Sequence, residues 1–363
     1  MIKSCDVGSL PFVGDFQLYS NGASDYDQRV NDASLFFEKK AVEGFVDKAR
    51  AGIEVPSYPQ YRDMTSMFFD VIEGLGRANG GYIETAPLTL KDRRGAIAEV
   101  SAIKNRSKQI YEKLGDSFQL RICVTGPYTL SSLLSSKDKN TFTRLGKVLT
   151  EIIEANIFNI REGSVRLVSI DEPAFGFIDE PLLDRGSEGR ENLLKAWEAM
   201  AQKITEKGAE ACLHLHNTSD ELFWDVKTIK MIESHVNDPF YQAKRTKERL
   251  ETTDKLVKAS IATTDFDELI RDHFIKRSEK KLGEISLNER LADTWKQLNA
   301  KQIDPTTFVE DIELMKARLW KIMTSLGENR VLYAGSECGL RSFPTYESAI
   351  ECLKRVSRAV RGG

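Results

Sequence analysis

The chain has 363 residues, a length that suits one large α/β domain or two ordinary ones. Hydrophobic residues make up 41% of it and charged residues 29%, so it can bury a core, and disordered or fibrous classes are excluded. Its 52 basic and 55 acidic residues nearly balance, which gives no global attraction to nucleic acid or anionic lipid. Because no apolar run could span a bilayer or serve as a secretory signal, we expect a cytoplasmic protein without nucleic-acid or membrane partners.

Apolar runs predict eight β-strands, near 2–8, 51–56, 119–124, 165–170, 210–215, 228–233, 256–262 and 330–335. Several of these runs, such as LRICV and VRLVSI, are almost continuous, as is typical of parallel strands buried on both faces. Amphipathic stretches between them predict helices at 28–50, 61–79, 92–114, 139–162, 188–207 and 343–360. This alternation predicts a parallel α/β fold, and eight strands favour a closed (β/α)8 TIM barrel over an open doubly wound sheet.

Two segments interrupt the alternation. Residues 80–90 indicate an extended hairpin or arm before the third barrel unit. Residues 264–329 are too long for one crossover helix, and charged helical patterns at 265–282, 286–302 and 306–326 indicate a helical insertion between strands seven and eight. Without a linker or repeat, the sequence predicts a single domain over 1–363.

Polar residues, glycine and proline follow six of the predicted strands. In a TIM barrel the functional residues lie at these strand ends, on one face of the barrel. The chain places there Gly8-Ser9, Thr125-Gly126-Pro127, Asp171-Glu172-Pro173, His214-Leu215-His216, Glu233-Ser234-His235 and Glu337-Cys338-Gly339. We therefore expect one functional mouth that these loops share.

A metal site is the chemistry that these strand ends favour. Alternate side chains of an extended segment point the same way, so His214 and His216 could face one ion. Glu233 and Cys338 come from neighbouring strand ends, and imidazole, carboxylate and thiolate together suit Zn²⁺. His235 alternates with Glu233 and competes for the ligand role. The alternative is structural, since a lone cysteine after a strand is more often a small buried residue.

Six motifs resemble the C-terminal catalytic half of cobalamin-independent methionine synthase, in its short archaeal-type core form. They are VGSLP at 7–11, TGPYTL at 125–130, SIDEPAF at 169–175, HLH at 214–216, IES at 232–234 and SECGLRSFPTYESAIECLKRV at 336–356. The resemblance covers nearly the whole chain. It implies a TIM barrel that binds a catalytic zinc ion and transfers a methyl group to a thiol in methionine biosynthesis.

The family's functional residues can be carried over position by position. The resemblance implies four zinc ligands, His214, His216, Glu233 and Cys338. It also implies that the catalytic acid Asp171 contacts an amino-acid substrate and that Gly8 and Ser9 hold the substrate carboxylate. Tyr58 and Gln60 stand where the family has a second amine-binding glutamate, which makes them candidate substrate-binding residues.

Three departures from the family pattern bear on the reaction. His216 replaces a cysteine, so the ligand set is one unit less negative. No acid stands at 58–60, so the ammonium of homocysteine would lose a partner. The family's proton-donating histidine falls near Thr263 and Thr264, which argues for a donor other than a folate.

Three hypotheses follow from the sequence. The leading one is zinc-dependent methyl transfer from a methylated corrinoid, a corrinoid protein or another methyl carrier to homocysteine, giving methionine. The second changes the acceptor to a thiol without an amine, such as a thiol sulfonate coenzyme. The third is a non-catalytic zinc- or corrinoid-binding homologue in which His216 has disabled the chemistry.

Overall fold

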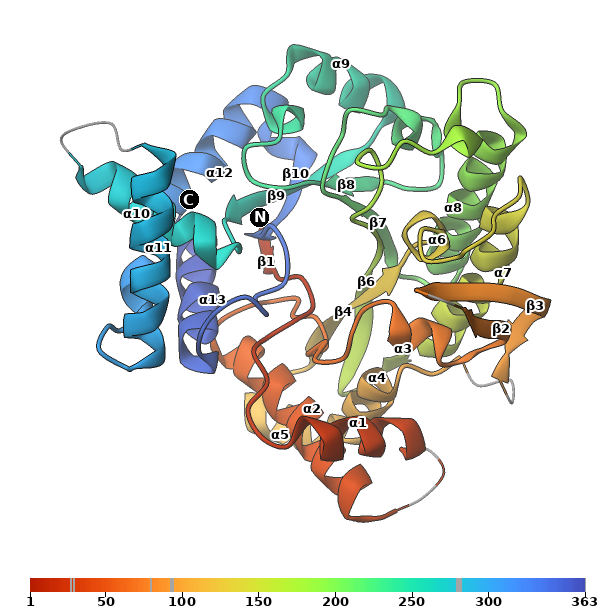
Figure 1. Cartoon of the computed structure of the whole chain (residues 1–363), viewed down its shortest axis with the longest axis horizontal. Helices are drawn as coiled ribbons and strands as arrows, with labels where there is room; N and C mark the ends of the chain where they lie inside the picture. The colour runs from red at the N-terminus through yellow and green to blue at the C-terminus, as the bar shows by residue number, and fades with distance from the viewer. Residues whose placement is uncertain (27, 29, 79, 92–94, 279–282, 363) are drawn as a thin grey trace.

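The computed structural model describes residues 1–26, 28, 30–78, 80–91, 95–278 and 283–362. Its main sheet is parallel and runs in the order β1, β10, β9, β8, β7, β6 and β4, and these strands form a ring with helices outside it (Figure 1). They are β1 (Lys3–Cys5), β4 (Phe118–Thr125), β6 (Gly163–Glu172), β7 (Glu210–Leu215), β8 (Met231–Glu233), β9 (Leu256–Ala262) and β10 (Val331–Ser336). The two-residue strand β5 (Asn159–Ile160) pairs antiparallel with β6.

Two isolated bridges close the ring between β1 and β4. Val55 pairs with Cys5 of β1, and Ser57 pairs with Arg121 of β4, both in parallel. The proline between them has no N–H to give to a ladder, so the second strand predicted at 51–56 is present only as this bridged segment. The predicted TIM-barrel fold is confirmed, with seven regular strands and one irregular segment in the ring.

Helices cover the outside of the ring. They are α1 (Phe16–Asp25), α2 (Asp32–Arg50), α3 (Ser66–Phe69), α4 (Ala98–Asn105), α5 (Ser107–Leu114), α6 (Pro127–Ser131), α7 (Thr141–Asn156), α8 (Glu188–Glu206), α9 (Lys244–Thr253), α10 (Phe266–Arg277), α11 (Glu284–Asn299), α12 (Ile312–Leu326) and α13 (Tyr346–Arg361). Short 3₁₀ helices lie at Pro181–Leu183, Leu222–Asp225, Pro239–Tyr241, Pro305–Phe308 and Glu328–Arg330. Within the described ranges, every helix is too short or too polar to cross a membrane.

The helix predicted at 61–79 is wrong. Only the short α3 forms there, and the chain then enters an antiparallel hairpin of β2 (Ile72–Ala78) and β3 (Gly81–Leu90), which extends the arm predicted at 80–90. Gly74 explains the difference, because its φ of +87° is outside the helical region and a Cβ there would lie 2.6 Å from the Ala86 carbonyl oxygen. Residue 79 lies outside the described residues.

Two other predicted helices have different bounds. Helix α2 begins at Asp32, where Asn31 and Ser34 form a reciprocal cap, and residue 29 of the predicted 28–50 helix is not among the described residues. The helix predicted at 92–114 is divided into α4 and α5, and residues 92–94 lie outside the described residues. In both places the apolar periodicity gave the correct type of element and the wrong boundary.

The predicted insertion at 264–329 contains α10, α11 and α12. Helix α12 packs on β9 and α13, and its Arg318 donates a hydrogen bond to the Ile261 carbonyl at 3.0 Å. It is therefore the barrel helix between β9 and β10, and the added part is α10 and α11, which pack on each other at the edge of the molecule (Figure 1). Residues 279–282 between them, and residue 363 of the domain predicted over 1–363, lie outside the described residues.

A buried ion pair stabilises the irregular side of the ring. Lys48 of α2 reaches Asp6 at 2.7 Å and donates to Ser57 Oγ and to the Gly8 carbonyl, and both charged side chains are almost fully buried. We predict that Lys48→Met lowers the free energy of unfolding by about 3–5 kcal/mol, because it leaves the buried Asp6 carboxylate without a compensating positive charge. Urea unfolding measures the change. The exposed Lys39→Met is the control, and equal stability of the two variants would contradict the prediction.

Candidate metal centre

Four side chains that could bind one metal ion meet at the barrel mouth. His214 lies in β7, His216 follows that strand, His235 follows β8, and Cys338 follows β10. One ligand atom of each lies within 4.8 Å of the others. The His216 and His235 rings are 3.9 Å apart, and Cys338 Sγ is 3.7 Å from His216 Nε2. The parallel strands produce this convergence, because their carboxyl ends share one face of the barrel.

The chemistry of this cluster fits Zn²⁺. The Nε2 atoms of His214 and His235 are buried and have no hydrogen-bond partner among the described residues. Burial, with the charge of His214, lowers the pKa of His216 to about 2 and that of His235 to about 4, so both rings are neutral at pH 7. Neutral imidazoles and a thiolate are common zinc ligands. Three nitrogen atoms and one sulfur atom complete a four-coordinate set.

Glu233, the fourth predicted ligand, lies beside this cluster. Its fully buried carboxylate accepts two hydrogen bonds from Arg121, lies 3.2 Å from Lys258 Nζ, and is 2.9 Å from His214 Nδ1. Burial would raise the pKa of Glu233, but the Arg121 and Lys258 cations outweigh it and hold that pKa well below its usual range. The Glu233 carboxylate thus meets the cluster at the Nδ1 side of the His214 imidazole.

The same carboxylate controls the protonation of His214. Burial lowers the pKa of His214, but the charge of Glu233 opposes it and raises that pKa to about 10. A metal ion bound at Nε2 would release one proton, while the Nδ1–H keeps its contact with Glu233. Carboxylates that hold the second nitrogen of a ligating histidine are a recurrent feature of metal sites.

Arg121 and Lys258 were not identified from the sequence as part of the site. Each is a charged residue inside an almost continuous apolar strand, LRICV or LVKASIA, and each is fully buried. Charged residues are rarely buried unless they are paired. A single cation within a buried strand was therefore the available signal that the barrel interior holds an acid.

Asp171 lies next to the cluster. It is the last residue but one of β6 and pairs in register with His214 of β7. Its Oδ1 is buried without a hydrogen-bond partner among the described residues, and burial raises its pKa. The neighbouring Glu172 instead accepts hydrogen bonds from Tyr128 N and Trp197 Nε1. Asp171 is thus the carboxyl group at this strand end that remains available to a substrate.

The loop after β1 contacts the loop that carries Cys338. The Ser9 carbonyl accepts a hydrogen bond from Leu340 N at 2.8 Å, and a Cβ on Gly339 would lie 2.1 Å from Ser9 Oγ. Gly8 has a φ of +44°, and a Cβ there would meet Gln60 Oε1 at 2.6 Å. Of the two predicted substrate residues, Ser9 is therefore held against the Cys338 loop, and Gly8 is held against Gln60.

Tyr58 and Gln60, two further predicted substrate residues, are engaged within the protein. The Tyr58 hydroxyl donates to the Cys123 carbonyl at 2.8 Å, and Gln60 Nε2 donates to Tyr58 and lies 3.6 Å from Met67 sulfur. Both side chains are buried. Their contact with a substrate stays a prediction.

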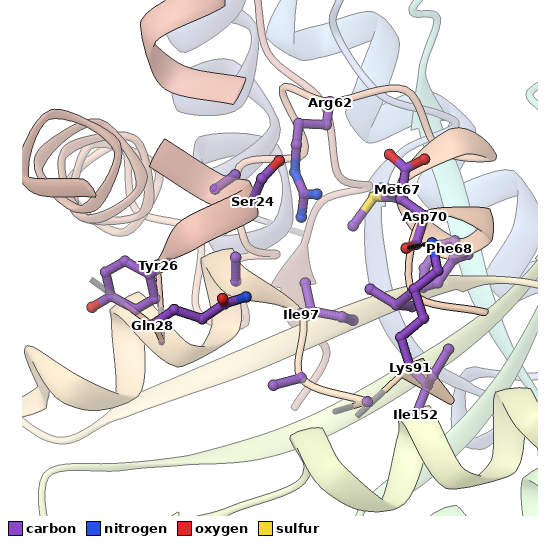
Figure 2. A pocket seen from close by; sticks show the side chains of 15 residues that line it. Ser24, Tyr26, Gln28, Arg62, Met67, Phe68, Asp70, Lys91, Ile97 and Ile152 are labelled. Atoms are coloured by element: carbon purple, nitrogen blue, oxygen red, sulfur yellow. Dashed lines mark hydrogen bonds between the residues drawn. The ribbon is translucent and has the colours of Figure 1, made fainter. Parts of the chain in front are cut away.

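A separate cavity of about 210 Å³ lies near α1, α4 and the β2–β3 hairpin (Figure 2). Its lining includes Gln28, Arg62 and Lys91 and shares no residue with the four-residue cluster among the described residues. Arg62 pairs with Glu99 through two hydrogen bonds, and Lys91 donates to the Asp70 carbonyl. Because both cations already have partners, the barrel mouth remains the candidate functional site.

The fold resembles two solved structures. The structure of a B12-independent methionine synthase from Shewanella sp. W3-18-1 in complex with selenomethionine matches 100% of this chain and 98% of that chain, with a TM-score of 0.60 and 13% sequence identity. A Listeria monocytogenes protein assigned as a vitamin B12-independent methionine synthase matches over the same fractions, with a TM-score of 0.58 and 11% identity. No family model and no curated protein matches the chain. The chain therefore has the fold of the B12-independent methionine synthase structures.

The ligand set can be tested by metal binding. We predict that Cys338→Ser and His235→Ala lose stoichiometric zinc, because each removes one of the four converging atoms. Glu233→Gln should keep one zinc per chain with an affinity reduced about 10- to 100-fold, as is usual for a group that orients a ligand. Metal analysis after dialysis against a graded chelator measures both effects.

Cys352→Ser and His273→Ala are the matched controls, since neither residue belongs to the cluster. Circular dichroism should show that every variant is folded. Complete loss of zinc from folded Glu233→Gln, with zinc retained by His235→Ala, would instead support Glu233 as the ligand.

Proposed function

We propose that the protein is a zinc-dependent thiol S-methyltransferase of the cobalamin-independent methionine synthase family. One observation carries the proposal: three imidazoles and a thiol converge at the mouth of a barrel of this fold, next to the unpartnered carboxyl group of Asp171. Four protein ligands would close a zinc site, so the acceptor thiol would displace one of them or add as a fifth ligand. His216, His235 and Cys338 are each partly exposed, which leaves the cluster open to a substrate.

His214, His216, His235 and Cys338 would hold the ion. A bound Zn²⁺ would lower the pKa of an acceptor thiol, which is about 8.5 when free, and so make it nucleophilic at neutral pH. The protein supplies orientation: the Glu233 carboxylate fixes the His214 ring. Holding the acceptor in one position can contribute a large part of the rate.

We propose homocysteine, or a thiol very similar to it, as the acceptor. Asp171 provides a buried carboxyl group for the ammonium, and the loop at Gly8 and Ser9 provides backbone groups for the carboxylate. No acid stands at 58–60, so Asp171 would be the main partner of the ammonium. This dependence on one acid gives a sharp test of the acceptor.

The methyl donor and the location of the reaction stay predictions. The resemblance names a methylated corrinoid or corrinoid protein as donor, and turnover with methylcobalamin tests it. A cytoplasmic location and a role in methionine biosynthesis, which the family resemblance implies, also stay predictions.

We predict that Asp171→Asn lowers kcat/KM for homocysteine about 10- to 150-fold, which is the value of one hydrogen bond to a charged group. With 2-mercaptoethanesulfonate, a thiol that has no amine, the same substitution should change kcat/KM less than threefold. Both thiols are assayed with one methyl donor and zinc-loaded protein. Asp220→Asn, which alters an acid paired with Arg190, is the control.

Two results would count against the proposal. If Asp171→Asn affects both thiols equally, the residue does not recognise the amine, and a thiol sulfonate becomes the better acceptor. If zinc-loaded protein binds the thiol and methylates nothing with any donor, the chain is a non-catalytic homologue.

A further inference from the structure

A cavity of about 420 Å³ opens beside the metal cluster, on the side of β8, β9 and β10. His235 and Cys338 line one wall, and Phe266 of α10 and Trp295 of α11 line another. The added helices α10 and α11 therefore complete the cavity. The nearly buried His214 of the same four-residue cluster does not line the cavity, and its Nε2 atom has no hydrogen-bond partner among the described residues.

The charge of this cavity is strongly one-sided. Its lining includes the four acids Asp265, Asp267, Glu268 and Glu337 and, among the described residues, no lysine or arginine. An anionic ligand would be repelled here, and a cation would be attracted.

An aromatic ring accompanies these acids. The Trp295 indole N–H donates to Asp267 Oδ1 at 2.7 Å, so the ring is held by its edge. Phe266 packs against it, with the ring centroids 5.7 Å apart. An indole face next to carboxylates is the usual recognition element for methylated cations, which have apolar methyl groups and a diffuse positive charge.

We propose that this cavity binds the methyl donor, and that the donor is a small onium cation, either a sulfonium or a quaternary ammonium compound. This inference rests on the proposed thiol methyl transfer and names its second substrate. A volume of about 420 Å³ suits a small molecule. The carboxylates of Asp265, Asp267 and Glu268 favour positive charge, while that of Glu337 already accepts hydrogen bonds from Val236 N and Thr264 N. The position beside Cys338 brings the donor methyl to the centre that holds the acceptor sulfur.

The chemistry balances without an added acid. The acceptor thiol loses its proton to solvent, and its sulfur attacks the donor methyl carbon to form a new S–CH₃ bond. The bond from that methyl to the donor S⁺ or N⁺ breaks, and its electron pair stays on the donor, which leaves as a neutral thioether or tertiary amine. Loss of positive charge weakens its attraction to the acidic cavity, which favours release.

Binding of an unreactive probe tests the cavity directly. Choline and its neutral isostere 3,3-dimethyl-1-butanol are titrated into full-length, zinc-loaded protein without thiol. We expect choline to bind at least 10-fold more tightly than the isostere. Trp295→Leu should weaken choline binding about 10-fold by removing the ring face, and Glu268→Gln about threefold by removing one charge.

The matched controls are Trp320→Leu, which removes an exposed tryptophan on α12, and Glu289→Gln on α11, since neither residue lines the cavity. The Glu268 side chain makes no hydrogen bond among the described residues, and its backbone N–H, which binds Asp265, is unchanged by the substitution. Glu268→Gln should therefore fold normally and keep the test decisive if Trp295→Leu does not. Equal binding of choline and the isostere, or choline affinity unchanged in both cavity variants, overturns the proposal.

Turnover then assigns the donor. Trimethylsulfonium, tetramethylammonium and methylcobalamin are each supplied with homocysteine. The proposal expects methylation from at least one onium compound, reduced at least 10-fold in Trp295→Leu and unchanged in Trp320→Leu. Methylation by methylcobalamin alone overturns the donor assignment and leaves the proposed function intact, whereas no methylation by any donor refutes the proposed function and the donor role together.

Discussion

A buried ion network inside the barrel is the constraint on which the metal centre depends. Arg121 of β4 and Lys258 of β9 hold the carboxylate of Glu233, and that carboxylate holds His214. Burial raises the pKa of the neighbouring Cys5 to about 11, so this thiol stays neutral. Two cations and one carboxylate leave an excess positive charge in the interior, and buried groups of this kind are retained only in a fixed geometry. The network therefore links β4, β8 and β9 and fixes the orientation of the His214 imidazole.

This arrangement also determines the charge at the metal. With His235 in place of Glu233, the ligand atoms carry the single negative charge of the Cys338 thiolate. A bound Zn²⁺ would keep one net positive charge, and Glu233 lies close enough behind His214 to offset it. A positive centre favours the thiolate form of an acceptor. In the proposed reaction, a carboxylate behind His214 in place of one among the ligands would thus make the acceptor thiol more acidic.

Much of the site was predictable, and the missing part has a clear physical reason. Period-two alternation correctly brought His214 and His216 to one mouth with Cys338. The same alternation allows the side chains of Glu233 and His235 both to point into the barrel, so the sequence does not show which of the two joins the cluster. The place of Glu233 is set by its pairing with Arg121, which lies 112 residues away in the sequence. Local patterns carry no information on a pairing of that kind, just as they missed the backbone geometry at Gly74 that turns a predicted helix into a hairpin.

The proposed acceptor site and the proposed donor cavity adjoin at the four-residue cluster. Asp171 of β6 and Ser9 of the loop after β1 form the proposed acceptor site. The acidic cavity that α10 and α11 complete has His235, Cys338 and Gly339 in its wall, and Gly339 lies directly against Ser9. Methyl transfer requires the acceptor sulfur and the donor methyl carbon to meet, and two sites that share the loop after β10 bring them next to each other. Because only the donor cavity is formed against the added helical pair, a change in α10 and α11 would alter that cavity while the strand ends that carry the four cluster residues stay in place.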